Sequence, residues 1–257
     1  MTKRLTPPAS ILITGASSGI GAALAKAYAA DGVTLALSGR DRQRLDAVAT
    51  ACRDAGARVS AETIDVTERA AMTGWVTAAD EAAPLELVVA NAAISAQTSG
   101  TGDDGEQVRD IFAVNVAGVL NTVLPVIPRM RRRRRGQIAM MSSIAGFRGL
   151  PGAPAYSASK AAVKAYGEAL RGRLATDGIG VSVVCPGYVR SRMTADNDFP
   201  MPFLMDAGPA AAIIKRGLGR GKARICFPLP MHWAAWLLGA LPPSWTDPLL
   251  SRVPRKE

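Results

Sequence analysis

Thr14-Gly15-Ala16-Ser17-Ser18-Gly19-Ile20-Gly21 (TGASSGIG) closes an apolar run at residues 10–14 and opens a stretch rich in helix formers at residues 19–31. An apolar run stopped by glycine is typical of a buried strand, so the chain begins with a strand, a turn and a helix. Gly15 permits the tight turn, Gly19 lets the backbone approach an anion, and Gly21 allows close helix packing. A helix N-terminus presents free N–H groups and a positive dipole end, so this turn predicts a site for the pyrophosphate of a dinucleotide.

The alternation of apolar runs and helical stretches continues along most of the chain. Further strands are predicted at residues 33–38, 59–66, 85–91, 137–143, 180–185 and 224–227, and helices at residues 41–55, 67–82, 104–130, 156–177 and 207–218. Thr67 is the expected N-cap of one helix, and Pro125 and Pro128 are expected to kink or end another. Strands that are apolar throughout are typical of a parallel sheet covered on both faces. The pattern predicts an α/β fold with a doubly wound, Rossmann-like parallel sheet, a single domain over residues 1–257, and ligands at the carboxyl ends of the strands.

Positive charge is abundant but unevenly distributed. The 257 residues carry a formal net charge of +10, and six arginines lie in the run RMRRRRR at residues 129–135. This run lies between a predicted helix and a predicted strand and contains no aromatic residue, so we expect a solvated loop and no nucleic-acid partner. An acidic partner or an anionic membrane surface stays open as an alternative.

Cysteine and histidine usage indicates the cellular compartment. Cys52, Cys185 and Cys226 are odd in number and far apart along the chain, and His232 is the only histidine. This usage argues against a disulfide framework and a zinc site, so we expect a cytoplasmic protein without a metal. The sequence contains no run of the roughly 18 uninterrupted apolar residues that a membrane span needs.

Residues 15–19 also fit GxSxG, the nucleophile elbow of serine hydrolases. The required triad needs a histidine, and His232 lies in the apolar run MHWAAWLL, where a packed histidine is commoner than a base. The elbow would also follow the first strand, with no earlier strand and loop to supply an oxyanion donor. A serine hydrolase is therefore disfavoured.

The end of the second predicted strand, Ser38-Gly39-Arg40, bears on cofactor choice. An NAD-selective site places an acidic side chain here to accept hydrogen bonds from the adenosine ribose. Gly39 is expected to leave that space empty, and Arg40 can pair with a 2′-phosphate. NADP is therefore favoured as cofactor, with NAD possible. Arg42 and Arg44 can equally be ordinary charges on a helix surface.

Tyr156-Ser157-Ala158-Ser159-Lys160 places a phenol and an ammonium on one face of a predicted helix, since they are four residues apart. A neighbouring positive charge favours phenolate and is expected to lower the pKa of Tyr156. Such tuning suits a general acid and base for alcohol and ketone chemistry. The alternative is that the tyrosine and the lysine simply lie on a solvated helix face.

Several motifs together resemble the short-chain dehydrogenase/reductase superfamily. They are TGASSGIG, Asp65-Val66, Asn91-Ala92-Ala93, Asn115, Ser143 and YSASK, and the likeness runs from about residue 10 to about residue 225. The chain departs from the family in Ala90 and Ala93, which stand where Asn and Gly are usual. Ala93 puts a Cβ where the backbone passes close to the cofactor.

The resemblance implies a role for each matching residue. Ser143 orients the substrate oxygen, Tyr156 exchanges a proton with it, Lys160 lowers the Tyr156 pKa and holds the nicotinamide ribose, and Asn115 anchors a proton-relaying water. The implied cofactor-binding residues are Gly15, Ser17, Ser18, Gly19, Ile20, Gly21, Arg40, Asp65, Val66, Asn91, Tyr156, Lys160, Pro186, Val189 and Ser191. The implied activity is hydride transfer between nicotinamide and a carbonyl or secondary alcohol, by a homodimer or homotetramer. A non-catalytic NADP-binding sensor or scaffold on the same fold stays open as the alternative.

Substrate choice is expected to lie in residues 145–155 and 190–210. The second segment is rich in Met, Phe, Leu and Pro, which favours a partly apolar small molecule. Residues 226–257 form an apolar extension with three of the four tryptophans, Trp233, Trp236 and Trp245. We expect this extension to pack on the domain or on a partner subunit, with peripheral membrane contact as the second alternative.

Overall fold

The computed structural model describes residues 6–95, 105–195, 197 and 199–250. The strands are β1 (Ser10–Ile13), β2 (Thr34–Gly39), β3 (Arg58–Thr63), β4 (Leu87–Ala90), β5 (Gly136–Met141), β6 (Ile179–Pro186) and β7 (Arg224–Phe227). The α-helices are α1 (Gly19–Tyr28), α2 (Arg42–Asp54), α3 (Arg69–Ala82), α4 (Gly105–Phe112), α5 (Gly118–Val123), α6 (Ile127–Arg133), α7 (Pro154–Ala175), α8 (Arg192–Ala195), α9 (Ala207–Gly219), α10 (Leu229–Ala240) and α11 (Pro243–Leu250).

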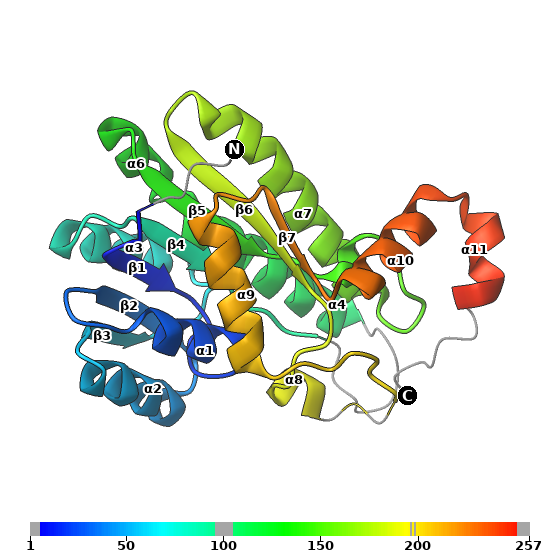
Figure 1. The fold of residues 1–257 in the computed structure, drawn as a ribbon, viewed down its shortest axis with the longest axis horizontal. Helices are drawn as coiled ribbons and strands as arrows, with labels where there is room; N and C mark the ends of the chain where they lie inside the picture. The colour runs from blue at the N-terminus through cyan, green and yellow to red at the C-terminus, as the bar shows by residue number, and fades with distance from the viewer. Residues whose placement is uncertain (1–5, 96–104, 196, 198, 251–257) are drawn as a thin grey trace.

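The strands form one parallel sheet in the order β3-β2-β1-β4-β5-β6-β7 (Figure 1). The strand order reverses between β1 and β4, which is the topological switch point of a doubly wound sheet. Ligands of such sheets bind at the carboxyl ends of the strands beside this point. The predicted Rossmann-like fold is therefore confirmed.

Alternate residues of each strand face opposite layers of helices. Ile11 and Ile13 pack in a core beneath α1, α2 and α9, whereas Leu12 packs beneath α3, α5, α6 and α7. These three strand residues are fully buried. Burial on both faces explains why the strands are apolar throughout, since every second residue meets one of two hydrophobic cores.

The predicted helix at residues 104–130 is interrupted twice, and residue 104 lies outside the described residues. A π turn, η1 (Ala113–Ala117), follows α4 and is centred on the buried Asn115. A second break separates α5 from α6, where Pro125 lies in a turn and Pro128 occupies the first turn of α6. Proline removes one helical hydrogen bond and fits a first helical turn, so the predicted interruption is confirmed.

By length and composition alone, the interrupted helical run Gly105–Arg133 is long and apolar enough to cross a membrane. In the structure it is a core element, because α4 packs on α7 and α5 packs on α3 and β4. Val119, Val123 and Met130 of this run are buried in the second core. Its apolar composition is explained by this packing.

Thr67 was expected to cap the third helix, and this prediction is wrong. The N-cap of α3 is Glu68, which makes no side-chain capping bond. The Thr67 hydroxyl instead donates to Asp65 Oδ1 at 2.8 Å, and the Thr67 N–H donates to the same oxygen at 2.9 Å. An aspartate that bonds the backbone two residues on forms a turn, so Thr67 stabilises the loop after β3 rather than the helix.

The arginine run was expected to be a solvated loop, and this prediction is also wrong. Most of it belongs to α6, and Arg133 donates to both carboxylate oxygens of Asp80, at 3.0 and 2.7 Å. Arg133 also donates to the Leu85 carbonyl oxygen, and Arg129 lies 3.5 Å from Asp80 Oδ2. The run therefore joins α6 to α3 through a carboxylate that is only 5% exposed, and to the segment before β4 through the Leu85 carbonyl oxygen.

Replacing Asp80 by Asn should destabilise the fold by about 2–4 kcal/mol, because Arg133 would lose its buried partner. Burial alone raises the pKa of Asp80, but hydrogen bonds from Arg133 and from the Leu85 N–H outweigh burial and lower it. The stabilisation is therefore complete above the unfolded pKa of about 3.9 and is lost as the pH falls below it. Urea unfolding between pH 3 and 7 measures both effects. The matched control Glu81→Gln, at a 63% exposed carboxylate paired with Arg129, should change stability by less than about 0.5 kcal/mol.

Two of the three cysteines, which are far apart along the chain, lie side by side in the fold. Cys185 on β6 is the register partner of Cys226 on β7, and both are free thiols. Their hydrogen bond, with burial, raises the pKa of Cys185, whereas the same bond lowers the pKa of Cys226. Separation along the sequence carries no information here, because parallel pairing brings distant strands together.

Candidate active site

The glycine-rich turn is held against the end of β4. Gly15 has φ +65°, a left-handed conformation that favours glycine. The Asn91 side chain donates to the carbonyl oxygens of Thr14 and Gly15 at 3.0 and 3.2 Å, and the Asn91 N–H donates to the Thr14 hydroxyl at 3.0 Å. A Cβ on Gly15 would lie 2.8 Å from Ala92 Cα. Asn91 therefore fixes the shape of the turn from the neighbouring strand.

The N-terminus of α1 is open to an anion. Ser18 is the N-cap of α1, in an extended conformation, and its side chain makes no capping bond. Gly19 follows with φ +53°, and Ile20 continues the first turn of the helix. The first N–H groups of a helix need partners, and a phosphate is well suited to provide them. The turn thus has the form that the pyrophosphate of a dinucleotide requires.

The loop after β6 lies across this turn. A Cβ on Gly19 would lie 3.1 Å from Ser191 Cβ, so the two segments are in close approach. Pro186 ends β6, and Val189 forms a bridge with Met205. The Thr194 hydroxyl donates to the Val189 carbonyl oxygen at 3.0 Å and accepts from the Ser191 N–H at 2.9 Å. The predicted residues of this loop therefore lie next to the predicted phosphate site.

At the end of β2, the prediction that Gly39 leaves an empty space is wrong. A Cβ on Gly39 would lie 3.0 Å from both Cβ and Oγ of Ser17, so the Ser17 side chain fills that position. Arg40 is exposed, and within the described residues it has no ion pair or side-chain hydrogen bond. Arg42 and Arg44 pair instead with Asp46 and Asp41. Among the residues that the structure describes, Arg40 is thus a cation without a partner at this end of the site.

The loop after β3 presents Asp65 and Val66. Asp65 holds its own turn through Thr67, and Val66 is buried against Gly118, where a Cβ would lie 2.6 Å from Val66 Cγ2. The Asn121 side chain donates to the Val66 carbonyl oxygen at 2.9 Å. The loop after β3 is therefore held in place by α5, which carries Gly118 and Asn121.

Ser143, Tyr156 and Lys160 come together at the carboxyl end of β5. Ser143 precedes the short helix η2 (Ile144–Gly146), and its hydroxyl donates to the Pro186 carbonyl oxygen at 3.4 Å and lies near enough to the Tyr156 phenol to lower its pKa. Lys160 is fully buried, with Nζ 3.1 Å from the Met141 carbonyl oxygen and 5.5 Å from the centre of the Tyr156 ring. The neighbouring Ser142 hydroxyl bonds the Lys160 carbonyl oxygen, so Ser143 alone of the two serines faces the tyrosine.

Asn115, in the π turn η1, connects α7 to the loop after β4. Its Nδ2 donates to the Ile94 carbonyl oxygen at 2.9 Å and to the Ser159 hydroxyl at 3.0 Å, and its Oδ1 accepts from the Ile94 N–H at 2.8 Å. The Ser159 hydroxyl in turn donates to the Tyr156 carbonyl oxygen at 2.7 Å. The Asn115 side chain therefore joins the π turn, the loop after β4 and α7.

The tyrosine pKa moves in the direction opposite to that predicted. Burial raises the pKa of Tyr156, and the nearby Ser143 hydroxyl, which lowers it, does not compensate. Burial also lowers the pKa of Lys160 to about 8. Removing both groups from water disfavours their charged forms, so the expected lowering of the Tyr156 pKa by Lys160 is not found. Tyr156 is therefore a neutral phenol at pH 7.

The serine hydrolase alternative finds no support in this geometry. The His232 ring packs edge-on against Phe147, with the ring centres 5.0 Å apart, and lies 5.3 Å from the Trp233 ring. Within the described residues, His232 makes no contact with Ser17, which instead lies against Gly39. The residues of the GxSxG pattern are instead part of the glycine-rich turn.

Four polar residues that position the site were not singled out from the sequence. They are Thr14, Asn121, Ser159 and Thr194. Thr14 and Ser159 lie inside motifs that were recognised, so a search for buried hydroxyls there would have found them. Asn121 carries no local signal, because its partner is the Val66 carbonyl oxygen, which only the folded chain brings near. The partners of Thr194 are the backbone groups of Ser191 and Val189, three and five residues away, so its role is local to the loop after β6.

A dinucleotide-binding turn at a switch point, combined with a serine, tyrosine and lysine at the end of β5, defines a dehydrogenase of the doubly wound class. The short-chain dehydrogenase family matches residues 9–199. The chain is 40% identical, over 95% of its own length and 96% of the relative's, to an uncharacterized oxidoreductase of Myxococcus xanthus. This protein belongs to the short-chain dehydrogenase/reductase superfamily and is an oxidoreductase.

Two solved structures are similar over nearly the whole chain. One is a short-chain dehydrogenase from Sphingobium yanoikuyae in complex with NADPH, with a TM-score of 0.78, 27% identity, and coverage of 96% of this chain and 97% of that one. The other is a short-chain dehydrogenase/reductase from Burkholderia phymatum in complex with NAD, with a TM-score of 0.81, 25% identity, and coverage of 97% and 96%.

Proposed function

We propose that this protein is an NADP-dependent oxidoreductase that acts on a carbonyl or secondary alcohol group, with Tyr156 as the proton donor and acceptor. The observation that carries the proposal is the buried Lys160 ammonium 5.5 Å from the centre of the Tyr156 ring, with the Ser143 hydroxyl near the phenol. A sensor or scaffold would have no need of a lysine at this position, where burial disfavours its charged form and lowers its pKa to about 8. The intact set therefore favours catalysis over a non-catalytic role.

Ser143 and Tyr156 would hold the substrate oxygen between them. The Ser143 hydroxyl already accepts from the Ala145 N–H at 3.1 Å, which fixes its orientation at the start of η2. Two hydroxyls directed at one oxygen position it and polarise it. The neutral phenol of Tyr156 then donates its proton to that oxygen during reduction.

The bound dinucleotide would supply the hydride, which no side chain can provide. Gly15, Gly19 and the first turn of α1 would hold its pyrophosphate. Lys160 would exchange its bond with Met141 for the ribose hydroxyls. Asn115 would anchor a water through its main chain, because its side chain already bonds Ile94 and Ser159.

The cofactor preference rests on Arg40. One of the similar solved structures holds NADPH and the other holds NAD, so family membership alone leaves either dinucleotide open. Arg40 is exposed and unpaired within the described residues, beside a β2 end that has no acidic side chain at residue 38, 39 or 40. A guanidinium in this place can bond a 2′-phosphate bidentately.

Replacing Arg40 by Asp should lower the preference for NADPH over NADH about 10- to 100-fold, the effect of losing a charge-assisted pair. Steady-state kinetics with both dinucleotides measures the ratio of kcat/KM. Arg42→Ser is the matched control, because Arg42 pairs with Asp46 and should leave the ratio unchanged. An unaltered ratio in the Arg40 variant would contradict the NADP assignment. Gly39 is unsuitable for this test, since any side chain there would displace Ser17.

The substrate side of the site favours a partly apolar molecule. The Tyr188 and Phe199 rings meet edge-on with centres 6.1 Å apart, and Met205 bridges Val189 across the mouth of the loop. Residues 196 and 198 of the predicted specificity segment lie outside the described residues. A screen of NADPH oxidation against ketones, aldehydes, 3-oxoacyl thioesters, steroids and quinones tests the function. Failure of the whole set, with NADPH bound, would contradict it.

Assembly as a homodimer or homotetramer in the cytoplasm completes the proposal. Free cysteines side by side on β6 and β7 suit a reducing compartment. Sedimentation velocity across a range of protein concentrations tests the oligomeric state, and a monomer at every concentration would contradict it.

A further inference from the structure

The helices α10 and α11, called here the C-terminal helices, leave most of their apolar surface in solvent. Figure 1 shows them projecting from the edge of the molecule next to β7. No residue of α10 is buried. Six large apolar side chains of the C-terminal helices are 47–70% exposed: Leu229, Trp233, Trp236, Leu237, Trp245 and Leu249. An exposed apolar patch of this kind marks an interaction surface.

The C-terminal helices are nevertheless fixed to the domain, beside the active site. Arg148 donates to Asp247 at 2.7 Å and to the Thr246 hydroxyl at 3.1 Å. A Cβ on Gly187 would lie 2.9 Å from Pro228 Cδ and 3.2 Å from Met231 Sδ. The apolar surface is thus presented in a defined orientation.

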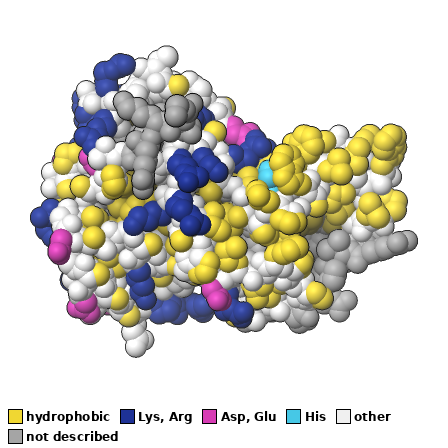
Figure 2. All heavy atoms as spheres, in the orientation of Figure 1, with side chains coloured by type: hydrophobic (Ala, Val, Ile, Leu, Met, Phe, Trp, Pro, Cys, Tyr) yellow, Lys and Arg dark blue, Asp and Glu magenta, His cyan; other side chains and the backbone are white. Residues whose placement is uncertain are grey.

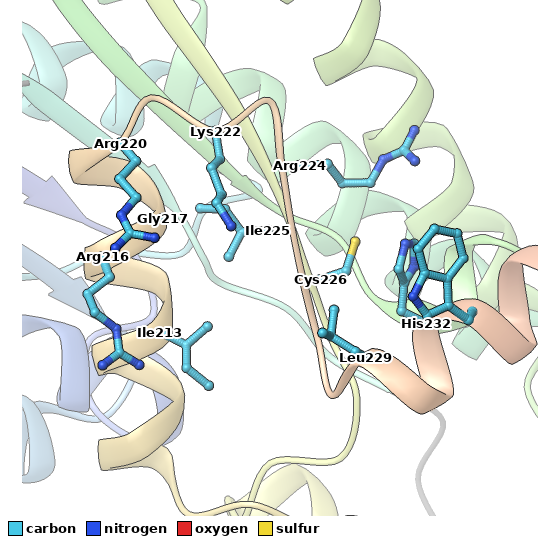
Figure 3. Close-up of a pocket in the computed structure, with 11 residues that line it drawn as sticks. Ile213, Arg216, Gly217, Arg220, Lys222, Arg224, Ile225, Cys226, Leu229 and His232 are labelled. Carbon is cyan, nitrogen blue, oxygen red and sulfur yellow. The ribbon is translucent and has the colours of Figure 1, made fainter. Parts of the chain in front are cut away.

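A groove lies between α9, β7 and α10, with a volume of about 600 Å³. Arg216, Arg220 and Lys222 line its α9 side, and Leu229 and His232 come from α10 (Figure 3). The three cations are exposed, and within the described residues none of them has an ion pair. His232 Nδ1 is buried without a hydrogen-bond partner in the same part of the chain. The groove therefore combines unpaired positive charge with an apolar wall.

Acidic residues are absent from this part of the sequence. Residues 207–246 contain no Asp or Glu, whereas they include Lys215, Arg216, Arg220, Lys222 and Arg224. Figure 2 shows Lys and Arg side chains gathered over the end of α9, next to the apolar side chains of the C-terminal helices. A surface that is both apolar and basic complements the headgroups and acyl chains of anionic lipids.

We propose that this groove binds the phosphate headgroup of an anionic phospholipid in a membrane surface, while the C-terminal helices insert their tryptophans into the interface. Trp and Leu side chains at headgroup depth gain from both the apolar and the polar layers. The basic residues of the groove then lie at the level of the lipid phosphates. The contact requires no catalytic turnover, so it does not rest on the proposed function.

A second copy of the chain fits the same surface less well. A two-fold dimer brings one patch against its own copy. The unpaired cations of both subunits would then approach each other without an acidic residue from 207–246 to pair with them. Like charges brought together oppose association, whereas an anionic membrane neutralises them.

Flotation of the full chain with vesicles tests the proposal. We expect binding to phosphatidylglycerol mixed with phosphatidylcholine and much weaker binding to phosphatidylcholine alone. The variant Arg216→Ser/Arg220→Ser/Lys222→Ser should bind the mixed vesicles about 100-fold more weakly, since each cation near the surface contributes about fivefold. The matched control Arg69→Ser/Arg132→Ser/Arg173→Ser removes the same charge from exposed, unpaired positions on α3, α6 and α7 and should change binding far less. Equal losses in both variants would reduce the effect to net charge and overturn the proposal.

The apolar contribution to binding and the source of the phosphate are tested in separate experiments. Trp233→Ser/Trp236→Ser should weaken vesicle binding at unchanged thermal stability, because both rings are exposed, whereas Phe112→Ser/Leu124→Ser at exposed apolar sites elsewhere should not. Alkylation of Cys226, which lines the groove, should slow on vesicle binding but not in inorganic phosphate. Equal protection by inorganic phosphate would assign the groove to a soluble anion. Self-association through the Trp positions without vesicle binding would assign the surface to a second copy.

Discussion

The Tyr156→Phe variant should lose about 10²- to 10⁴-fold in kcat, the usual contribution of a positioned general acid. Phenylalanine keeps the ring over which the Lys160 ammonium lies but removes the proton that the substrate oxygen must receive. Dinucleotide binding, measured by quenching of protein fluorescence, should change little. Unchanged turnover of every substrate would contradict the mechanism.

A control on the same helix separates the phenol from general damage to α7. Tyr166→Phe removes a hydroxyl from a residue that packs against the core beneath α3, α5, α6 and α7, and it should leave kcat unchanged. The pH dependence gives a second test. Because burial raises the pKa of Tyr156, the phenol stays protonated at neutral pH, and reduction should decline only as alkaline pH removes that proton.

The Lys160→Met variant should lose activity by about 10²-fold or more, yet it should be more stable than the wild type without a dinucleotide at pH 7. Lys160 is 1% exposed, and burial of its charge lowers its pKa to about 8. Methionine fills a similar volume without a charge to desolvate, so we expect a gain of about 2 kcal/mol after loss of the bond to Met141. Chemical denaturation measures this gain.

The pH dependence of stability follows from the same lowered pKa. Between about pH 8 and the unfolded pKa of about 10.4, the unfolded chain binds more protons at this lysine than the folded chain does. Lys160 should therefore contribute a rise in stability with pH across that window, against the opposite contribution of thiols and phenols whose pKa is raised, and this rise, measured as the difference from the wild type, should be absent in Lys160→Met. Lys164→Met, one turn further along α7 and next to Glu168, is the matched control and should retain the rise. Loss of this rise with pH in both variants would mean that another group titrates.

The order of elements and the core of the site follow from local sequence. Apolar runs alternate with helical stretches, and this alternation alone predicts the doubly wound sheet that β1 to β7 form. The glycine-rich turn is equally local, because strand, turn and helix lie within a single octapeptide and its neighbours. Tyr156 and Lys160 lie four residues apart on a helix, and helical geometry brings their side chains together.

Other features depend on partners that are distant in sequence. Arg133 was expected in a solvated loop, yet it meets Asp80 from another helix, more than 50 residues away. Cys185 meets Cys226 only because β6 pairs with β7. Ser17 occupies the space beside Gly39 because the first turn folds over the end of β2. No rule based on the spacing of residues along the sequence predicts such contacts.

The sequence by itself determined the fold, the family motifs and the identity of the tyrosine, serine and lysine, since each depends on neighbours a few residues away. The tertiary structure alone decided the direction of the Tyr156 pKa and the exposure of the C-terminal helices. Both are consequences of which groups are removed from water. Desolvation depends on atoms gathered from the whole chain, and a pattern of residues along one segment does not contain it.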